Sequence, residues 1–140
     1  MGDRPNRPEG NDRIRSYRDL AVWQEAMGLV AEVYAMTRRF PDDERFGLSA
    51  QLRRAAVSIP SNVAEGWGRG RTNEYIRHLR SQHRRCAHAS LREAETQALI
   101  AERVGCLDAA SAHPVLDHAD RLSRMLRGLI RSLQRHASQA

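Results

Sequence analysis

Arginines recur at helical spacing in two stretches of the chain, and two further arginines lie in the segment before the first stretch. Within each stretch they stand three or four residues apart, which places them on one face of a helix. The planar guanidinium group donates two parallel hydrogen bonds to a phosphate. The sequence therefore predicts binding to the phosphate backbone of RNA or DNA through Arg69, Arg71, Arg77, Arg80, Arg84, Arg124, Arg127 and Arg131.

The charge is unevenly distributed between the two ends of an antiparallel bundle. Residues 11–28, 57–88 and 122–140 fall in one half, which has 13 arginines and five acidic residues and a net charge of +8. Residues 29–56 and 89–121 fall in the other half, whose net charge is −2. A basic end without matching acids is typical of a nucleic-acid-binding surface. The alternative is a solvated basic face, with the exclusive use of arginine reflecting genomic base composition.

A second polar pattern lies between residues 51 and 65. Its members stand three or four residues apart and share one helical face, next to an apolar stripe rather than opposite it. We predict a satisfied polar network at a helix or subunit contact, which fixes register more than it adds stability. A solvated face is the alternative. The predicted network consists of Gln51, Arg54, Ser58, Asn62 and Glu65, and the candidate partners are Glu93, Glu95 and Gln97.

The patterns that would indicate catalysis or metal binding do not occur in the sequence. A di-iron bundle requires Glu-x-x-His, and no such spacing is present. His78, His83 and His88 are five residues apart, about 140° around a helix at each step, so they do not converge on one metal ion. We expect a protein that is not an enzyme and that has no catalytic residues, no metal and no cofactor.

The elements that must position these residues are four long helices. The apolar periodicity predicts helices over 17–39, 43–66, 72–104 and 109–136, within one domain that covers residues 16–140. Ser16 and Asp19 resemble a capping box at the first helix, and Gly105 ends the third. Short connections favour antiparallel neighbours, and hence an up-down-up-down four-helix bundle. Residues 1–15 are polar and aperiodic, which predicts a disordered tail.

The first helix carries two apolar faces. Leu20, Trp23, Met27, Val30 and Tyr34 form one face, and a second set at the same spacing lies beside it. A helix in a monomeric bundle normally buries one stripe, so two faces predict a subunit interface in which each face meets a different bundle. The alternative is a deeply buried helix. The predicted oligomer interface consists of Val22, Leu29, Val33 and Met36.

Composition limits the class of protein further. The chain has 140 residues, 41% of them hydrophobic, which suffices for the core of one domain. No apolar run approaches the length of a membrane span, and no apolar segment typical of a signal peptide lies near the start. Two cysteines do not make a disulfide framework. We expect a cytoplasmic protein without a membrane partner.

Several segments of the chain also resemble a known family, the four-helix-bundle proteins encoded in 23S ribosomal RNA intervening sequences. The most specific are residues 17–24 (YRDLAVWQ) and 51–66 (QLRRAAVSIPSNVAEG). Shorter matches are Phe40-Pro41 with Glu44 and Gly47-Leu48, and Ser90-Leu91 with Glu93, Glu95, Thr96 and Gln97. The resemblance extends over about residues 17–135.

This resemblance implies a left-handed four-helix bundle that assembles as a ring-shaped homopentamer. The family is similar to the accessory protein of diversity-generating retroelements, which binds a reverse transcriptase and nucleic acid. Two functional hypotheses follow. The first is a non-enzymatic oligomer that binds RNA or DNA through its arginine-rich end. The alternative is a protein-binding scaffold or accessory subunit, for example of a reverse transcriptase, or a family member that has no assigned function.

Overall fold

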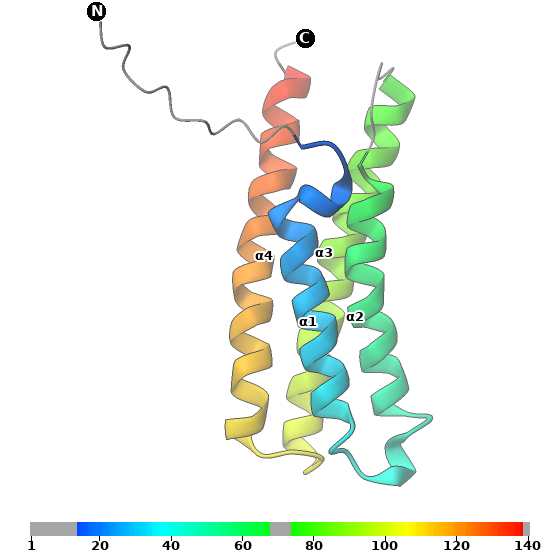
Figure 1. Ribbon diagram of the computed structural model, residues 1–140, viewed down its shortest axis with the longest axis vertical. Helices are drawn as coiled ribbons and strands as arrows, with labels where there is room; N and C mark the ends of the chain where they lie inside the picture. Colours follow the sequence, from blue (N-terminus) through cyan, green and yellow to red (C-terminus); the bar gives the residue numbers. More distant parts are fainter. Residues whose placement is uncertain (1–13, 68–73, 139–140) are drawn as a thin grey trace, which may run out of the picture.

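The computed structural model describes residues 14–67 and 74–138. Four α-helices, α1 (Ala21–Thr37), α2 (Leu48–Glu65), α3 (Glu74–Arg103) and α4 (Ala109–Ser138), lie side by side along their lengths (Figure 1). Single 3-10 turns, η1 (Tyr17–Asp19) and η2 (Asp42–Glu44), precede α1 and α2. No β-strand occurs in the described residues, so the prediction of an all-α protein with four helices is confirmed. None of the helices in these ranges is long and apolar enough to cross a membrane.

The helices run along the vertical axis of Figure 1, so the molecule has an upper and a lower end. At the upper end α1 and α3 begin and α2 and α4 end. At the lower end α1 and α3 end and α2 and α4 begin. The upper half of the molecule therefore contains the first half of α3 and the second half of α4, which carry the phosphate-binding arginines predicted on these helices. Of the predicted tail, only residues 14 and 15 are among those described.

The chain enters α1 through a capped single turn. Ser16 Oγ accepts a hydrogen bond from the backbone N of Arg18 (3.1 Å), and Asp19 Oδ2 accepts one from the backbone N of Ser16 (3.1 Å). This is the capping box that the sequence predicts, but it closes η1 rather than a long helix. Leu20 interrupts the helix because its backbone is extended (φ −71°, ψ 126°), so α1 begins at Ala21 and not at the predicted residue 17.

The connection from α1 to α2 is anchored at both ends. Phe40 is 6% exposed and fixes the chain to the core before Pro41. Glu44 then caps α2, because its Oε2 accepts a hydrogen bond from the backbone N of Leu48 (3.2 Å). A Cβ at Gly47 would lie 3.0 Å from that same oxygen, so a glycine leaves room for the capping carboxylate. The helix predicted from residue 43 is thus a 3-10 turn followed by α2.

The turn between α3 and α4 follows the predicted stop at Gly105. Its φ of +85° lies in the left-handed region that favours glycine, and the backbone N of Cys106 donates to the carbonyl of Ala101 (2.8 Å). Asp108 then caps α4, with its Oδ1 accepting from the backbone N of Ser111 (2.8 Å). Hydrogen bonds from Ser111 lower the pKa of Asp108, because they stabilise the carboxylate form.

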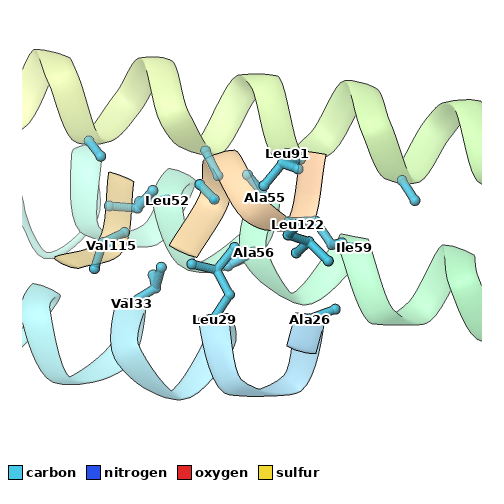
Figure 2. Packing of buried hydrophobic residues seen from close by; sticks show 14 of the residues in the cluster. Ala26, Leu29, Val33, Leu52, Ala55, Ala56, Ile59, Leu91, Val115 and Leu122 are labelled. Carbon is cyan, nitrogen blue, oxygen red and sulfur yellow. The ribbon is translucent and has the colours of Figure 1, made fainter. Parts of the chain in front are cut away.

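The core runs along the inside of all four helices (Figure 2). Its largest fully buried side chains include Leu29, Leu52, Ile59, Leu91 and Leu122, at least one from every helix. Between them lies a set of alanines that are 0% exposed and that let the helix backbones approach closely. These alanines are Ala26, Ala56, Ala87, Ala98, Ala101 and Ala112.

The face of α1 that we predicted to meet a second copy lies in this core. Val22, Leu29, Val33 and Met36 are 7%, 1%, 0% and 6% exposed within the single chain. They are therefore not available to another subunit, and their assignment to an oligomer interface is corrected. The other apolar face, which includes Met27 (44% exposed), points outward. Both faces have the same periodicity, so the sequence does not distinguish the inner one from the outer one.

Candidate nucleic-acid interface

The predicted arginines of α3 lie in the first half of that helix and those of α4 in its second half, so all of them lie in the upper half of the molecule. On α4 the three predicted arginines are all exposed: Arg124, Arg127 and Arg131. Of those on α3, Arg77 is exposed, whereas Arg80 is half-buried. The predicted residues Arg69 and Arg71 lie outside the described part of the chain.

Arg84 differs from the other predicted arginines because its side chain is buried. It is 9% exposed, and it stands three residues before Ala87 and seven before Leu91 on the core-facing stripe of α3. Arg80 and Arg77 continue the same spacing toward the upper end. The α3 arginines therefore extend the core stripe, whereas those of α4 lie on the solvent face. The prediction of Arg84 as a surface contact for a nucleic-acid backbone is corrected accordingly.

The electrostatic surroundings of the α4 arginines are positive. Arg124 pairs with Asp120 one turn below it (3.3 Å), and both side chains are about two-thirds exposed. No ion pair holds Arg127 or Arg131 among the residues that the structure describes. Burial, followed by the charges of Arg92 and Arg127, lowers the pKa of His88, and Glu95 offsets this only in part. His88 thus senses a net positive field at the contact between α3 and α4.

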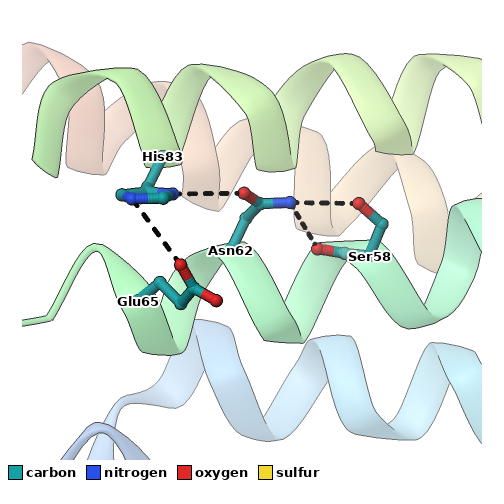
Figure 3. A network of polar contacts seen from close by, with 4 residues as sticks. All are labelled: Ser58, Asn62, Glu65 and His83. Atoms are coloured by element: carbon teal, nitrogen blue, oxygen red, sulfur yellow. Dashed lines mark hydrogen bonds and ion pairs between the residues drawn. The ribbon is translucent and has the colours of Figure 1, made fainter. Parts of the chain in front are cut away.

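A polar network joins α2 to α3 beside this end (Figure 3). Ser58 and Ser90 share a hydrogen bond between their hydroxyls (2.8 Å). The side-chain amide of Asn62 donates to the carbonyl (2.8 Å) and hydroxyl (3.0 Å) of Ser58, and its Oδ1 lies 3.4 Å from His83 Nδ1. The other nitrogen of His83 lies 3.7 Å from Glu65 Oε2. Three of the predicted stripe residues, Ser58, Asn62 and Glu65, thus belong to one chain of contacts.

The partners of this stripe differ from those predicted. Glu95 pairs with Arg92 (3.2 Å), and Gln97 donates to Glu93 (3.3 Å), so these three residues bond within α3. The remaining stripe residues, Gln51 and Arg54, are exposed. They line a groove of about 340 Å³ between α2 and α3, together with Ala55, Ser58, Ser90 and Glu93.

A buried histidine that the sequence analysis did not single out joins α4 to α1. His118 Nε2 lies 2.7 Å from Glu25 Oε2, and its Nδ1 lies 2.9 Å from Glu32 Oε1. Each ring nitrogen therefore faces one carboxylate of α1. Gly28 lies between the two glutamates and makes room for the ring, because a Cβ there would be 3.2 Å from His118 Cε1. The acid-glycine-acid spacing on the polar arc of α1 was the available sequence signal.

The outward face of α1 forms an apolar groove with α2. Trp23, Met27 and Val30 line one side, and Val57 and Pro60 line the other. Tyr17 closes it by an edge contact with Trp23, whose ring centroid lies 5.5 Å away. Met27 and Val57 are more than two-fifths exposed in the single chain. We call this surface the α1/α2 groove.

Potential metal ligands do not gather at one place in the described residues. These residues contain no group of three or more His, Cys, Asp and Glu side chains placed to hold a metal ion. Cys86 and Cys106 are free thiols. Burial, followed by the charges of Glu44 and Asp43, raises the pKa of Cys106, so this thiol is not activated as a nucleophile.

The fold and the surface together define an all-α, four-helix protein with arginines at one end. Comparison with known families identifies it further. The model of the 23S rRNA-intervening sequence protein family matches residues 18–128, and the chain belongs to that family. A comparison with curated proteins gives no match. The matched range begins just before α1 and ends within α4, so it includes the polar network, the α1/α2 groove except Tyr17, and most of the predicted arginines.

Proposed function

We propose that this protein is a non-enzymatic binder of RNA or DNA that contacts phosphate backbones with its upper end. The observation that supports this best is the exposed row of α4, where Arg124, Arg127 and Arg131 project from successive turns. One of the three has an acidic partner among the described residues, and that pair is itself exposed. Exposed guanidinium groups at this spacing fit a polyanion, because each can meet a phosphate without first leaving a buried salt bridge.

The proposed contacts are to phosphates and not to bases. A protein that recognises base sequence in a nucleic-acid groove needs an element that enters this groove with polar side chains directed at the base edges. The α4 row presents arginines alone, which suits positioning on a backbone and weak discrimination between sequences. Burial is the main cause of the lowered pKa of His88, and the charges of Arg92 and Arg127 add to it.

We also propose that the chain adopts the left-handed up-down-up-down connectivity that the family resemblance implies and assembles as a ring-shaped homopentamer. The α1/α2 groove is the surface proposed for the subunit contact, since it exposes Met27 and Val57 on an otherwise apolar lining. In such a ring the upper ends of five copies would face the same way. Weak contacts from each copy to one nucleic acid would then add by avidity.

Two variants of equal charge test the nucleic-acid proposal. One carries Arg124→Glu, Arg127→Glu and Arg131→Glu at the upper end. The control reverses three arginines at the lower end: Arg38, Arg39 and Arg103, all exposed. Each variant lowers the formal net charge from +6 to 0, because every reversal removes two charges. Circular dichroism verifies that both variants remain folded.

The readout is retention of the variants on heparin and on single-stranded RNA. We expect the upper-end variant to lose retention and the lower-end variant to keep most of it. Equal loss in both would show that net charge alone drives retention. Full retention in both would remove the α4 arginines from the interface.

A protein-binding scaffold is the second candidate, and the groove between α2 and α3 favours it. Arg54 and Glu93 place opposite charges on this groove, beside the hydroxyl pair of Ser58 and Ser90. A surface with both charges and with donors and acceptors suits a polypeptide better than a polyanion. Partner capture that survives nuclease treatment and is lost in Arg54→Ala with Glu93→Ala would support this function. Capture that nuclease abolishes would favour nucleic acid.

A further inference from the structure

Arg84 holds its guanidinium group inside the upper end of the bundle. The side chain occupies the next core-facing position of α3 above Ala87, and it is 9% exposed. The end of α2 lies beside the turn of α3 directly above it, because a Cβ at Gly66 would be 3.3 Å from His83 Cβ and 3.4 Å from the carbonyl oxygen of Arg80. Above that level α3 and α4 continue, with α1 and α2 absent (Figure 1). Among residues 77–103 of α3, Arg84 is thus the buried stripe residue nearest the upper end, just below the level at which α2 ends.

The charge of Arg84 has no counterion among the residues that the structure describes. Its Nη1 is buried and makes no hydrogen bond to them. Burial, followed by the charge of Arg80 one turn away, lowers the pKa of Arg84, and no acidic group acts in the opposite direction. Buried charges in proteins are normally paired, because removing them from water is costly. A buried guanidinium group without a counterion can be stabilised by binding an anion.

We propose that Arg84 and Arg80 form a site for a phosphate monoester, either free inorganic phosphate or the terminal phosphate of a nucleic-acid strand. The charges match, because a monoester near neutral pH carries about −1.5 to −2 and faces two guanidinium groups. A terminal phosphate has a sugar on one side only, so it can approach a recessed guanidinium group end-on, whereas a backbone diester is flanked by sugars on both sides.

This site and the α4 row have different tasks. The row of Arg124, Arg127 and Arg131 would hold a strand along its backbone, while Arg84 would recognise its end. Recognition of a strand end therefore rests on the proposed function. Binding of inorganic phosphate does not, because it needs only the two arginines of α3.

The first experiment measures the thermal midpoint against inorganic phosphate, with chloride added to keep the ionic strength equal. The test variant is Arg84→Met, which keeps a long apolar stem and removes the charge. The control is Arg103→Met, an exposed position at the other end of α3. We expect phosphate to raise the midpoint of the wild type and of the control but not of Arg84→Met. We also expect Arg84→Met to melt no lower than the wild type in chloride alone.

Equal phosphate-dependent shifts in the wild type and in Arg84→Met would overturn the proposal. In that case Arg84 only covers the core with its methylene stem. The same shift from acetate as from phosphate, at equal ionic strength, would also contradict it, because the site would then be selective for carboxylate or for no particular anion.

The second experiment compares a 5′-phosphorylated single strand with its 5′-hydroxyl form by fluorescence anisotropy, with the label at the 3′ end. We expect the wild type to bind the phosphorylated strand about ten- to a hundredfold more tightly, the range of one or two charge-assisted contacts. Arg84→Met should lose this preference and keep its affinity for the hydroxyl strand. Equal affinity of the wild type for both strands would refute recognition of the strand end.

The failure of one proposal is distinguishable from the failure of the other. If neither strand binds the wild type but phosphate still raises its midpoint through Arg84, then the proposed function fails, and the monoester site stands with free phosphate as its ligand. If both strands bind equally and phosphate shifts wild type and Arg84→Met alike, then the proposed function stands and the monoester site is refuted.

Discussion

The contact of His118 with two glutamates yields the sharpest prediction for the fold. His118→Ala removes two short contacts, 2.7 and 2.9 Å long, that join α4 to α1. Hydrogen bonds to charged groups contribute about 1.5–3 kcal/mol each, and the two carboxylates, each 42% exposed, recover part of this through hydration. The lost packing of a ring that is 5% exposed adds to the cost. We expect the free energy of unfolding to fall by about 2–4 kcal/mol.

Urea denaturation followed by circular dichroism measures this loss, and a second histidine of α4 serves as the matched control. His113 also contacts a carboxylate, Asp117 at 3.3 Å, but its side chain is 73% exposed. His113→Ala should change the free energy of unfolding by less than about 0.5 kcal/mol. If the two variants lose the same stability, the buried position of His118 between Glu25 and Glu32 does not contribute as argued.

Three further predictions concern the faces and ends of the helices. Met27→Glu should give monomers by sedimentation while the fold is retained. Leu29→Ala should instead lower the free energy of unfolding by about 2–5 kcal/mol. If the Met27→Glu protein still assembles, the subunit contact lies elsewhere. Gly105→Ala should lower the free energy of unfolding by about 1–2 kcal/mol, because Gly105 has a positive φ. Gly128→Ala, in open space within α4, should raise it by about 0.5–1 kcal/mol. Changes of the same sign for both variants in urea denaturation would contradict the turn geometry. Asp108 has a lowered pKa in the folded state, so its contribution to stability is complete above the ordinary aspartate pKa and is lost as the pH falls through the lower value. Asp108→Asn should flatten the dependence of stability on pH in that range. An unchanged pH dependence would refute the cap.

Local signals in the sequence predict much of the helical framework. Ser16 with Asp19 and the stop at Gly105 act within a few residues, and both motifs are present, although the capping box closes η1 rather than α1. The helix starts are predicted less well where the chain inserts a 3-10 turn. The extended backbone of Leu20 moves the start of α1 to Ala21. The carboxylate of Glu44 caps α2 at Leu48, so α2 begins later than predicted. Such turns satisfy the same backbone groups as an α-helix, so periodicity does not separate them from it.

Contacts between helices are predicted less well, because they depend on register. The polar face of α2 is evident from spacing, but its partners, Ser90 and His83, follow from how far α3 slides along α2. His118 is 86 residues from Glu32, so no local pattern connects them. Arg84 belongs by spacing both to an arginine row and to the core stripe. Its burial depends on how far α2 extends along α3, and the spacing of the sequence does not show this.

The salt dependence of RNA affinity tests the central proposal most directly. A strand bound through phosphates releases counterions, so the logarithm of the affinity should fall linearly with the logarithm of the salt concentration, by about 0.7 per phosphate contacted. We predict a steep negative slope for the wild type and a slope near zero for the protein with Arg124, Arg127 and Arg131 reversed to glutamate. An RNA affinity that does not change with salt, or a steep slope that persists in the reversed protein, would contradict binding through the upper end.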